Sequence, residues 1–572
     1  MAPYEPTTEQ RRVIAHDGNA FVRACPGAGK TRTIVERARV LISAEHDRRG
    51  AVFLSFTNTA IRELEERLRS YGIFPTPLFP HFIGTFDSFV WKFLIAPFGL
   101  DGCDAAPTLI PDKGAWEVKP FEAAQSLRLD FFSRDTGRLI PGLATRVGFA
   151  PKNGPGAWEA RARTMLANAH AAGRVDFDDV RAFVQGRLAD VGFAKRVGAA
   201  LRGRFKEIIV DEAQDCSPAD LRVVDWLRKS GIAVKIICDP NQAIYSFRGG
   251  LTDELLEFGM GFSVGDQLHI RGNFRSSPAI CSAISFLRPP GARGTPDVAL
   301  GRYNAETTPV HILAYAGTGV PSSIGDAFHK LARGLGICTG DAPVVAATLA
   351  SAAKAVGNPV IIPGDDRTLL LADSAVGYHL ADEAGRRREA LTGLHRAILL
   401  VQGCIGSVSD YSKYVLDEGL QDGRWRADAI SIGELLRVRP NEPADKWLKR
   451  AREALESGIV GAKTISQRLR TNKDLQAVLA RADQTPLPAR TIHGVKGLEF
   501  PAICVVLTTK TAKGILDVLE GESTVAEEDA RKIYVGASRA ERLLAIATPK
   551  SQAERLRAHL SKGTTPVRLV TL

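Results

Sequence analysis

The sequence predicts an α/β protein with parallel sheets flanked by helices, and three observations support that fold class. Short apolar runs typical of buried strands alternate with helical patterns. The first run leads into a glycine-rich loop that opens a helix, which is the context of a phosphate-binding P-loop. An apolar run at 208–210 ends in two adjacent carboxylates about 180 residues later. Because one strand–helix–strand unit takes about 30 residues, a separate domain must be inserted between them.

The composition is that of an ordinary globular protein. The chain has 572 residues, of which 45% are hydrophobic and 24% charged, and this length corresponds to roughly three to four domains. No stretch approaches the roughly 18 consecutive apolar residues of a membrane span. The N-terminus also lacks the charged and apolar regions of a signal peptide. We therefore expect no membrane association and a cytoplasmic location.

The charge balance points to a polyanionic partner. The net charge of +11 favours nucleic acid first. The eight cysteines are scattered, and no pair has the spacing of a zinc site. We therefore interpret them as reduced structural thiols.

The helix that opens the chain carries a candidate for base recognition. Thr7 is placed to cap this helix, and Gln10 lies in its first turn, fourteen residues before Ala24. The amide of Gln10 could contact adenine through both its donor and its acceptor atoms. The alternative is that Gln10 is simply a surface polar residue.

The segment from Ala24 to Thr31 reads A-x-x-x-x-G-K-T and is the candidate P-loop. Lys30 would reach the β- and γ-phosphates of a nucleotide, and the Thr31 hydroxyl would hold Mg²⁺. Ala24 stands where the strict pattern has glycine. The loop residues small enough for the backbone to curl around phosphate are Gly27, Ala28 and Gly29. The alternative is a glycine-containing turn with a solvated lysine.

Two later strands end in polar or aromatic residues beside a helix start. Phe56 ends the apolar run 51–56, and Thr85 ends the run that begins at Phe82. A nucleic-acid phosphate could bind at either helix N-terminus. Each piece taken alone is equally well an α/β packing unit.

Asp211 and Glu212 follow the predicted strand 207–210, of which 208–210 are apolar. Adjacent side chains at a strand end point in different directions, so Asp211 can serve Mg²⁺ while Glu212 orients and deprotonates water. Packing alone does not explain the pair, because unpaired buried carboxylates are energetically unfavourable.

The strand 234–238 leads into a loop that combines two predicted functions. Gln242 lies just past the strand end, placed to sense a γ-phosphate. Tyr245 and Phe247, followed by Arg248, form an aromatic and basic cluster. Stacking of a base on such a ring contributes about 1–3 kcal/mol and tolerates any sequence. The alternative is a hydrophobic anchor for the loop.

The order of these motifs resembles the UvrD/Rep group of superfamily 1 helicases. Three further segments look like motifs IV, V and VI of that family, namely 268–276, 491–500 and 534–540. The resemblance covers almost the whole chain. It implies two RecA-like domains that bind ATP and Mg²⁺ in the cleft between them.

The resemblance assigns roles within that cleft. Gln10 would contact adenine, Arg32 and Phe274 would sandwich its ring, and Glu499 would contact the ribose. Arg275 and Arg539 would reach the γ-phosphate from the second domain. Arginine fingers of this kind accelerate phosphoryl transfer by factors of about 10³–10⁵. Fingers on a separate domain would make hydrolysis depend on closure of the cleft.

The family also places single-stranded DNA across both domains. The matching positions are Phe56, Thr85, Tyr245, Phe247 and His493, and the direction of movement by analogy is 3′→5′. Single-stranded DNA, or DNA with single-stranded tails, is the expected partner. Thr59 and Asp87 depart from the family pattern along this path, where many relatives carry lysine and histidine.

The resemblance also implies a domain organisation in which each RecA-like domain is interrupted by a mainly helical insertion. The expected ranges are 1–100 and 203–262 for the first RecA-like domain, 101–202 for its insertion, 263–365 and 484–572 for the second RecA-like domain, and 366–483 for its insertion.

Two functions remain open at this point. The first is an ATP-driven translocase that unwinds duplex DNA. The second is a regulatory ATPase that controls a partner nuclease with little unwinding. The second follows from a similarity of 82–90 and 96–98 to the helicase-like B protein of the Gabija anti-phage system, whose partner is an ATPase-nuclease of the OLD type. A P-loop protein of another class, such as a kinase, is almost excluded by Phe274-Arg275 and Arg539.

Overall fold

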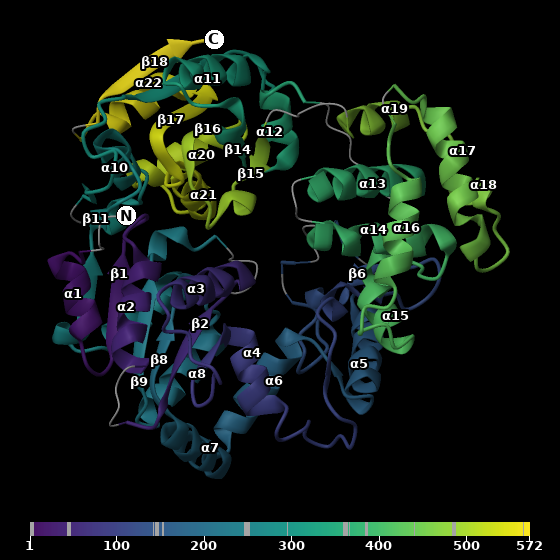
Figure 1. Ribbon diagram of the computed structural model, residues 1–572, viewed down its shortest axis with the longest axis horizontal. Coiled ribbons are helices and arrows are strands. Elements are labelled where there is room, and N and C mark those ends of the chain that lie inside the picture. Colours follow the sequence, from purple (N-terminus) through teal and green to yellow (C-terminus); the bar gives the residue numbers. More distant parts are fainter. Residues whose placement is uncertain are drawn as a thin grey trace. The chain divides into compact units, whose positions relative to one another are not determined.

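The computed structural model (Figure 1) divides into two compact units. Unit 1 comprises Met1–Phe93, Val184–Asn358 and Leu487–Leu572, and unit 2 comprises Leu94–Phe183 and Pro359–Pro486. The structure describes residues 5–42, 47–140, 142–143, 148–150, 154–244, 252–293, 296–358, 364, 366–383, 387–439, 441–482, 488–563 and 565–572. Among these residues, no helix has both the length and the apolar character that a membrane span requires.

Unit 1 contains a first sheet of six parallel strands in the order β10-β1-β9-β8-β2-β3. Most strand residues are buried, as expected for a parallel sheet covered on both faces. The strands are β1 (Ala20–Ala24), β2 (Gly50–Ser55), β3 (Phe82–Thr85), β8 (Phe205–Val210), β9 (Ala233–Cys238) and β10 (Gln267–Ile270). The helices are α1 (Thr8–Ala15), α2 (Lys30–Ile42), α3 (Asn58–Ser70), α4 (Phe86–Val90), α7 (Val191–Arg204), α8 (Pro218–Lys229) and α9 (Thr252–Met260).

The helix starts of this sheet follow the capping signals in the sequence. Thr7 caps α1, and its side chain and that of Gln10 form a reciprocal capping box. Ser217 and Asp220 form the same arrangement at the start of α8, where Pro218 occupies the first helical position. These local signals therefore set where the helices begin.

The first sheet extends past the boundary that the sequence places at 262/263. Strand β10 pairs in parallel with β1, with Leu268 opposite Val22. The motif IV-like segment therefore contributes its strand to the first sheet, and the boundary prediction is wrong at this point. The physical reason is that β10 satisfies the backbone donors and acceptors along an edge of β1 that would otherwise lack partners.

The first insertion is also shorter than the expected 101–202. Helix α7 belongs to unit 1, whose second segment begins at Val184. It packs on α8, where the Trp226 indole N–H donates to the carbonyl oxygen of Ala194 at 3.3 Å. Buried Val197 and Leu201 lie on the same helix. Packing on the sheet domain, which the helical pattern alone does not encode, therefore decides the boundary.

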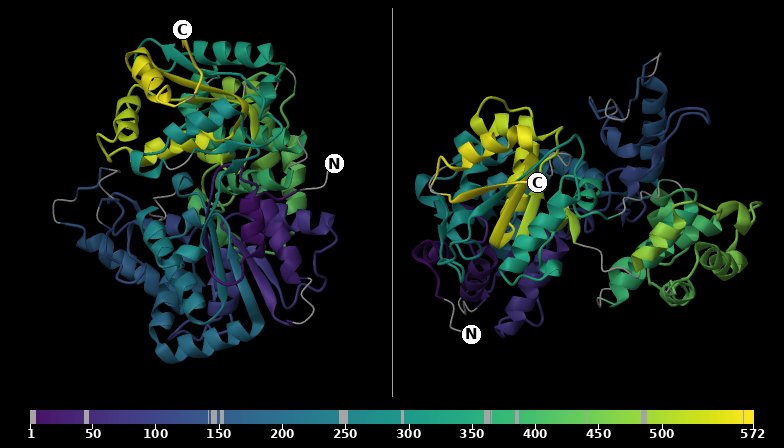
Figure 2. Two further views of the ribbon diagram at one scale, coloured as in Figure 1. Left: turned by 90° about the vertical axis from the view of Figure 1, so that its left-hand side faces the viewer. Right: turned by 90° about the horizontal axis from the view of Figure 1, so that it is seen from above.

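A second sheet of six parallel strands completes unit 1, in the order β15-β14-β16-β17-β13-β18. The apolar runs 310–313, 343–346, 503–507 and 543–546 of the sequence each overlap one of the four inner strands, which start or end up to three residues away from these runs. The two edge strands are β15 and β18. The chain ends just after β18 (Figures 1 and 2). The strands are β13 (Val310–Tyr315), β14 (Val344–Ala346), β15 (Ala489–Thr491), β16 (Phe500–Val506), β17 (Ala540–Pro549) and β18 (Val567–Thr571).

Helices and a short ribbon surround the second sheet, and buried side chains fill both of its faces. The helices are α10 (Pro278–Phe286), α11 (Ser323–Gly334), α12 (Leu349–Ala355), α20 (Ala512–Glu520), α21 (Glu527–Ala537) and α22 (Lys550–Leu560). The ribbon pairs β11 (Gly272–Asn273) with β12 (Val298–Ala299).

Unit 2 combines segments from two distant parts of the chain. The first segment contains α5 (Gly156–Ala171) and the start of α6 (Phe177–Ala189), together with two small sheets formed by β4 (Thr108–Leu109) with β7 (Arg174–Val175) and β5 (Glu117–Val118) with β6 (Leu127–Arg128). The second segment is helical, with a core of its own. Its helices are α13 (Arg367–Glu383), α14 (Arg387–Gln402), α15 (Tyr411–Asp417), α16 (Arg426–Leu435), α17 (Ala444–Leu455), α18 (Ile465–Arg468) and α19 (Leu475–Leu479).

Candidate functional site

The P-loop links the end of β1 to the start of α2. Gly27 and Gly29 have φ values of 69° and 70°, in the left-handed region that favours glycine. A Cβ atom on Gly27 would lie 2.6 Å from Asn273 Oδ1 and from Arg275 Cβ. The Gly27 carbonyl oxygen accepts a hydrogen bond from the Phe274 N–H at 2.8 Å. The loop conformation therefore requires glycine, both for its torsions and for the close approach of 273–275.

The N-terminus of α2 has the features of an anion-binding site. The first backbone N–H groups of any α-helix have no intrahelical acceptor, and the helix dipole favours negative charge beside them. Lys30 is the first residue of α2. The unpaired backbone N–H groups and a positively charged side chain therefore belong to the same turn of the helix.

Lys30 and the two carboxylates of the adjacent strand form the charged centre of the site. The Lys30 Nζ lies 3.5 Å from Glu212 Oε1. Burial opposes the charged form of Lys30, but Glu212, Asp211 and Asp239 outweigh it and raise the lysine pKa. Lys30 is therefore positively charged at neutral pH.

The two carboxylates differ in their electrostatic environment. Burial and the neighbouring Glu212 charge raise the pKa of Asp211. Burial acts in the same direction on Glu212, but Lys30 and Lys496 outweigh it and hold the pKa of Glu212 below its usual range. Glu212 is therefore ionised and suited to accept a proton.

The backbone of Glu212 adopts an unusual conformation. Its φ is 53° and its ψ 37°, which is left-handed for a residue with a side chain. Such torsions cost about 1–3 kcal/mol and cluster at active sites. The Gln214 side-chain amide donates a hydrogen bond to Glu212 Oε2. The turn therefore holds this carboxylate in one orientation, facing Lys30.

The residues predicted to hold Mg²⁺ lie together. Thr31 and Asp211 line the same small crevice, which Ser55 also borders. Hydroxyl and carboxylate oxygens are the ligands that Mg²⁺ prefers, usually one or two of them together with water and substrate phosphates. The residues present therefore fit this ion.

A network of hydrogen bonds joins the two sheets around Gln242. The Gln242 amide nitrogen donates to Asp239 Oδ2 at 2.8 Å, and Arg539 Nη2 donates to Gln242 Oε1 at 2.6 Å. The Tyr534 hydroxyl, on α21, donates to the same Asp239 oxygen at 3.0 Å. An arginine that follows α21 thus reaches the end of a strand of the first sheet.

Sequence reasoning missed Asp239 and Tyr534 as site residues. Asp239 had a local signal, because it directly follows a buried strand as Asp211 does. Tyr534 lies within the motif VI-like segment, but its partner is 295 positions away. Burial and Arg275 lower the pKa of Arg539 to about 10, so this guanidinium stays charged at neutral pH.

The structure pairs Arg275 with Glu499. Arg275 Nη2 lies 2.6 Å from Glu499 Oε1, and Arg275 Nη1 donates to the carbonyl oxygen of Ser538 at 2.8 Å. The predicted finger and the predicted ribose contact are thus each other's partners here. Each would have to leave this ion pair to contact a nucleotide.

The three residues expected around adenine all lie near the loop. The Gln10 amide nitrogen donates to the carbonyl oxygen of Ala28 at 2.8 Å, and its oxygen accepts from the Thr7 N–H at 2.9 Å. Phe274 is half-buried, and its ring lies close to Gly29. Arg32 is exposed in the first turn of α2. Gln10 is therefore buried against the P-loop, which the surface alternative does not allow.

The sequence matches two family models in three stretches of the chain. Residues 6–117 and 150–263 match the UvrD/REP helicase N-terminal domain, and residues 465–551 match the UvrD-like helicase C-terminal domain. These stretches make up more than half of the chain. The chain belongs to the UvrD-like helicases.

Several members of the UvrD-like family are similar to this chain. ATP-dependent DNA helicase UvrD2 of Mycobacterium tuberculosis is 23% identical over 595 residues, which cover 95% of this chain and 78% of the relative. DNA helicase II of Haemophilus influenzae is 26% identical over 296 residues, covering 49% of this chain and 39% of the relative. The Salmonella typhimurium DNA helicase II is 26% identical over 293 residues, with the same coverage.

In this UvrD-like chain two residues expected to contact DNA lie at neighbouring strand ends. The Phe56 ring stacks on Phe86, with centroids 5.4 Å apart and planes 13° apart. Thr85 caps α4, and its hydroxyl accepts from the Ser88 N–H at 3.1 Å. Ser55 and Thr85 are register partners in the pairing of β2 with β3. Both residues therefore lie along one edge of the first sheet.

The remaining predicted DNA contacts come from other segments of the UvrD-like chain. His493 Nε2 lies 3.1 Å from the carbonyl oxygen of Ile244. Tyr245, Phe247 and Arg248 lie outside the described residues. His493 therefore contacts the residue that directly precedes the predicted stacking loop.

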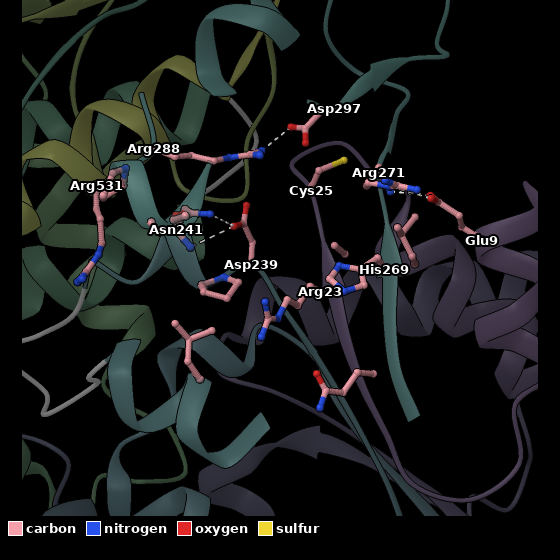
Figure 3. A pocket seen from close by; sticks show the side chains of 18 of the residues that line it. Glu9, Arg23, Cys25, Asp239, Asn241, His269, Arg271, Arg288, Asp297 and Arg531 are labelled. Atoms are coloured by element: carbon pink, nitrogen blue, oxygen red, sulfur yellow. Dashed lines mark hydrogen bonds and ion pairs between the residues drawn. The ribbon is translucent and has the colours of Figure 1, made fainter. Parts of the chain in front are cut away.

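A cavity of about 800 Å³ lies beside the P-loop strand of this UvrD-like chain (Figure 3). The described residues that line it include Ala24, Cys25 and Asp239. Two ion pairs lie among the residues that line the cavity. Arg288 Nη2 is 2.6 Å from Asp297 Oδ2, and Arg271 Nε is 3.0 Å from Glu9 Oε1. The cavity thus borders the ATP site through the end of β1 and the start of the Gln242 turn.

Proposed function

We propose that the protein is an ATP-dependent DNA helicase that translocates along single-stranded DNA in the 3′→5′ direction. The observation that carries this proposal is the hydrogen bond from Arg539 of the second sheet to Gln242 of the first. It supports an ATP site assembled from both sheets, so that hydrolysis depends on how the sheets are held together. Because the chain belongs to the UvrD-like helicases, we infer that the polymer along which it translocates is DNA.

The residues of the first sheet would bind ATP and activate water. Lys30 and the start of α2 bind the phosphates, and Thr31 with Asp211 hold Mg²⁺, which neutralises phosphate charge when bound. Ionised Glu212 accepts the proton of the attacking water. Its left-handed turn keeps this carboxylate in place, so no rearrangement is needed when the water arrives.

The arginines of the second sheet would stabilise the transition state. Arg539 already contacts Gln242, the residue proposed to sense the γ-phosphate. Arg275 would first exchange Glu499 for the phosphate. Arg275 would then be in position for hydrolysis only when a nucleotide is bound. A motor that cycles between two conformations requires such a dependence on nucleotide.

Strand displacement by the intact protein tests the proposal. Labelled duplexes with a 3′ tail, with a 5′ tail and with blunt ends are mixed with protein, ATP and Mg²⁺. We expect displacement of the 3′-tailed duplex alone and none when ATP is omitted. Displacement of the 5′-tailed duplex would reverse the direction. Absence of both displacement and DNA-stimulated hydrolysis would overturn the function.

The second candidate is a regulatory ATPase acting with a nuclease of the OLD type. It is favoured by the similarity of 82–90 and 96–98 to the B protein of the Gabija system. This candidate predicts DNA-stimulated hydrolysis without displacement, together with co-purification of a nuclease. The displacement assay and a pull-down from the native host therefore separate the two candidates.

A further inference from the structure

The cavity beside the P-loop strand has a lining that is largely separate from the ATP site. Its volume of about 800 Å³ falls within the range of about 300–1,000 Å³ that is usual for small-molecule sites. Of the described residues that line it, only Ala24 and Asp239 also belong to the candidate ATP site, and none belongs to the predicted DNA path. The cavity lies at the carboxyl ends of β1, β9 and β10, where open α/β sheets usually bind their ligands.

One wall of the cavity is a face of the first sheet. Arg23 of β1 and His269 of β10 are register partners in neighbouring parallel strands, so their side chains stand on the same face of the sheet. Gln267 lies two residues before His269 and therefore belongs to that face as well. All three side chains line the cavity, and Figure 3 shows Arg23 and His269. The sheet thus presents hydrogen-bonding groups to the cavity.

The acidic side chains that line the cavity already have partners or are exposed. Asp239 accepts hydrogen bonds from Gln242 and Tyr534, and Asp253 is exposed. The other described carboxylates of the lining form ion pairs with arginines of the same lining, namely Glu9 with Arg271, Asp297 with Arg288 and Glu527 with Arg531.

Positive charge and an unsatisfied donor are left over. Among the described residues, no carboxylate forms an ion pair with half-buried Arg23 or with exposed Arg12, and both arginines line the cavity. The buried Nε of Arg288 also has no hydrogen-bond partner among these residues, although buried donors in proteins are almost always paired. Burial, together with the charges of Arg23 and Arg271, lowers the pKa of His269. This part of the lining therefore fits an anion.

Apolar side chains make up much of the remaining lining. Leu256, Ile270, Pro240 and Pro289 all border the cavity. Small-molecule sites usually combine such apolar walls with a few placed polar groups. An arginine guanidinium binds a phosphate or a carboxylate through two parallel hydrogen bonds. The lining therefore suits a ligand that has both an organic body and an acidic group.

We propose that this cavity binds an organic anion of about mononucleotide size, whose phosphate or carboxylate group is held by Arg23 and Arg288. The apolar residues contact the organic body of the ligand. This site is additional to the ATP site, and it does not depend on the proposed function, because Arg23 and Arg288 have no part in hydrolysis or in the predicted DNA path.

Isothermal titration calorimetry on the full-length protein tests the site. The ATP site is first filled with a non-hydrolysable ATP analogue and Mg²⁺, at about 150 mM salt to screen exposed charges. The probes are inorganic phosphate, succinate and uridine monophosphate, which separate a bare phosphate, a carboxylate and a nucleotide. We expect at least one probe to bind once per chain. Failure of all three to bind would overturn the proposal.

Variants of the lining locate the bound probe. Arg23→Met keeps the apolar stem and should raise the Kd by about tenfold or more, because a charge-assisted hydrogen bond is lost. Arg23→Lys keeps the charge without the planar fork and should give an intermediate loss. It remains informative where Arg23→Met lowers the Tm. Arg12→Met should raise the Kd by only about two- to threefold, because Arg12 is exposed.

Arg333→Met is the matched control. Arg333 is an exposed arginine of α11 that does not line the cavity, and its replacement should leave the Kd within about twofold of the wild type. Equal weakening in Arg333→Met and Arg23→Met would reduce the binding to general attraction by a basic protein and would refute the site.

Three other results would also contradict the proposal. An unchanged Kd in Arg23→Met would place the probe elsewhere. Binding that occurs only when the ATP analogue is left out would assign the probe to the ATP site. Displacement of the probe by oligothymidine would assign the cavity to DNA. Each of these results leaves the proposed helicase function intact, because that function is tested separately by strand displacement.

Discussion

Glu212 shows how a single residue combines backbone and electrostatic constraints. Its backbone adopts the left-handed conformation, at φ 53°, two residues after the end of β8. The Lys30 ammonium group, 3.5 Å away, then favours the ionised form. Asp211, one position earlier, has the opposite tendency because burial and Glu212 favour its protonated form. Glu212 is therefore ready to accept a proton from water, whereas Asp211 would give up its proton when Mg²⁺ binds, because the charge of the ion favours the carboxylate.

At this scale we predict that Lys30→Ala and Glu212→Ala abolish ATP hydrolysis while single-strand binding survives. Loss of a general base alone costs about 10²–10⁴-fold in rate. Turnover is followed by phosphate release, and DNA binding by fluorescence anisotropy. Glu66→Ala, at an exposed position of α3, serves as a control and should behave as the wild type. Turnover at the wild-type rate in either site variant would refute the assignment.

Among the elements, α14 of unit 2 carries a buried histidine that links it to its neighbours. The His395 ring stacks on Trp425 at 4.0 Å, and its Nδ1 lies 3.0 Å from the Tyr411 hydroxyl. Burial lowers the pKa of His395 to about 4. The folded helices thus hold this ring in its neutral form across the range in which an exposed histidine becomes protonated.

The stability of this helical segment should therefore fall in acid. An unfolded histidine titrates near pH 6.5, so between pH 6.5 and 4 the unfolded chain binds a proton that the folded chain does not. The free energy of unfolding decreases over that window by up to about 3 kcal/mol and is unaffected by this group above pH 6.5. Urea unfolding followed by tryptophan fluorescence at pH 7.5, 6 and 5 measures the effect.

His395→Phe is the matched variant, because it keeps a ring against Trp425 without a titrating group. It should be less stable than the wild type at pH 7.5 by about 1 kcal/mol, since the Tyr411 hydrogen bond is lost. The difference should shrink or reverse at pH 5. An unchanged difference between the two proteins from pH 7.5 to 5 would show that His395 does not titrate as described.

At the level of the whole molecule, the residues proposed to bind nucleotide and DNA come from segments far apart in the chain. Within unit 1, the hydrogen bonds of Arg539, Tyr534 and Lys496 each join residues that are more than 280 positions apart. The net charge of +11 belongs to the chain as a whole. Together these features suit a protein that binds a polyanion and whose affinity for it changes with the state of the bound nucleotide.

Binding of single-stranded DNA should therefore be salt-dependent and tolerant of sequence. We expect the logarithm of the affinity to fall linearly with the logarithm of salt concentration, by about 0.7 per phosphate contacted. Oligonucleotides of equal length and different sequence should bind within about threefold of one another. Anisotropy titrations from 50 to 300 mM salt, at about the concentrations where this effect is large, provide the measurement. Binding that is independent of salt or strongly selective for sequence would contradict the expected contacts to the DNA phosphate backbone.

Much of the candidate ATP site rests on patterns that the sequence shows by itself. The P-loop, the Asp211-Glu212 pair and the buried strands rest on short-range chemistry, because phosphate, Mg²⁺ and a sheet interior each demand particular residue types at close spacing. Tertiary structure decided what local patterns do not encode. It placed β10 in the first sheet, paired Arg275 with Glu499 across 224 positions, and joined Asp239 to Tyr534 and Asp215 to Lys496. These partners meet only when distant segments fold together, since hydrogen bonds and ion pairs depend on distance in space and not along the chain.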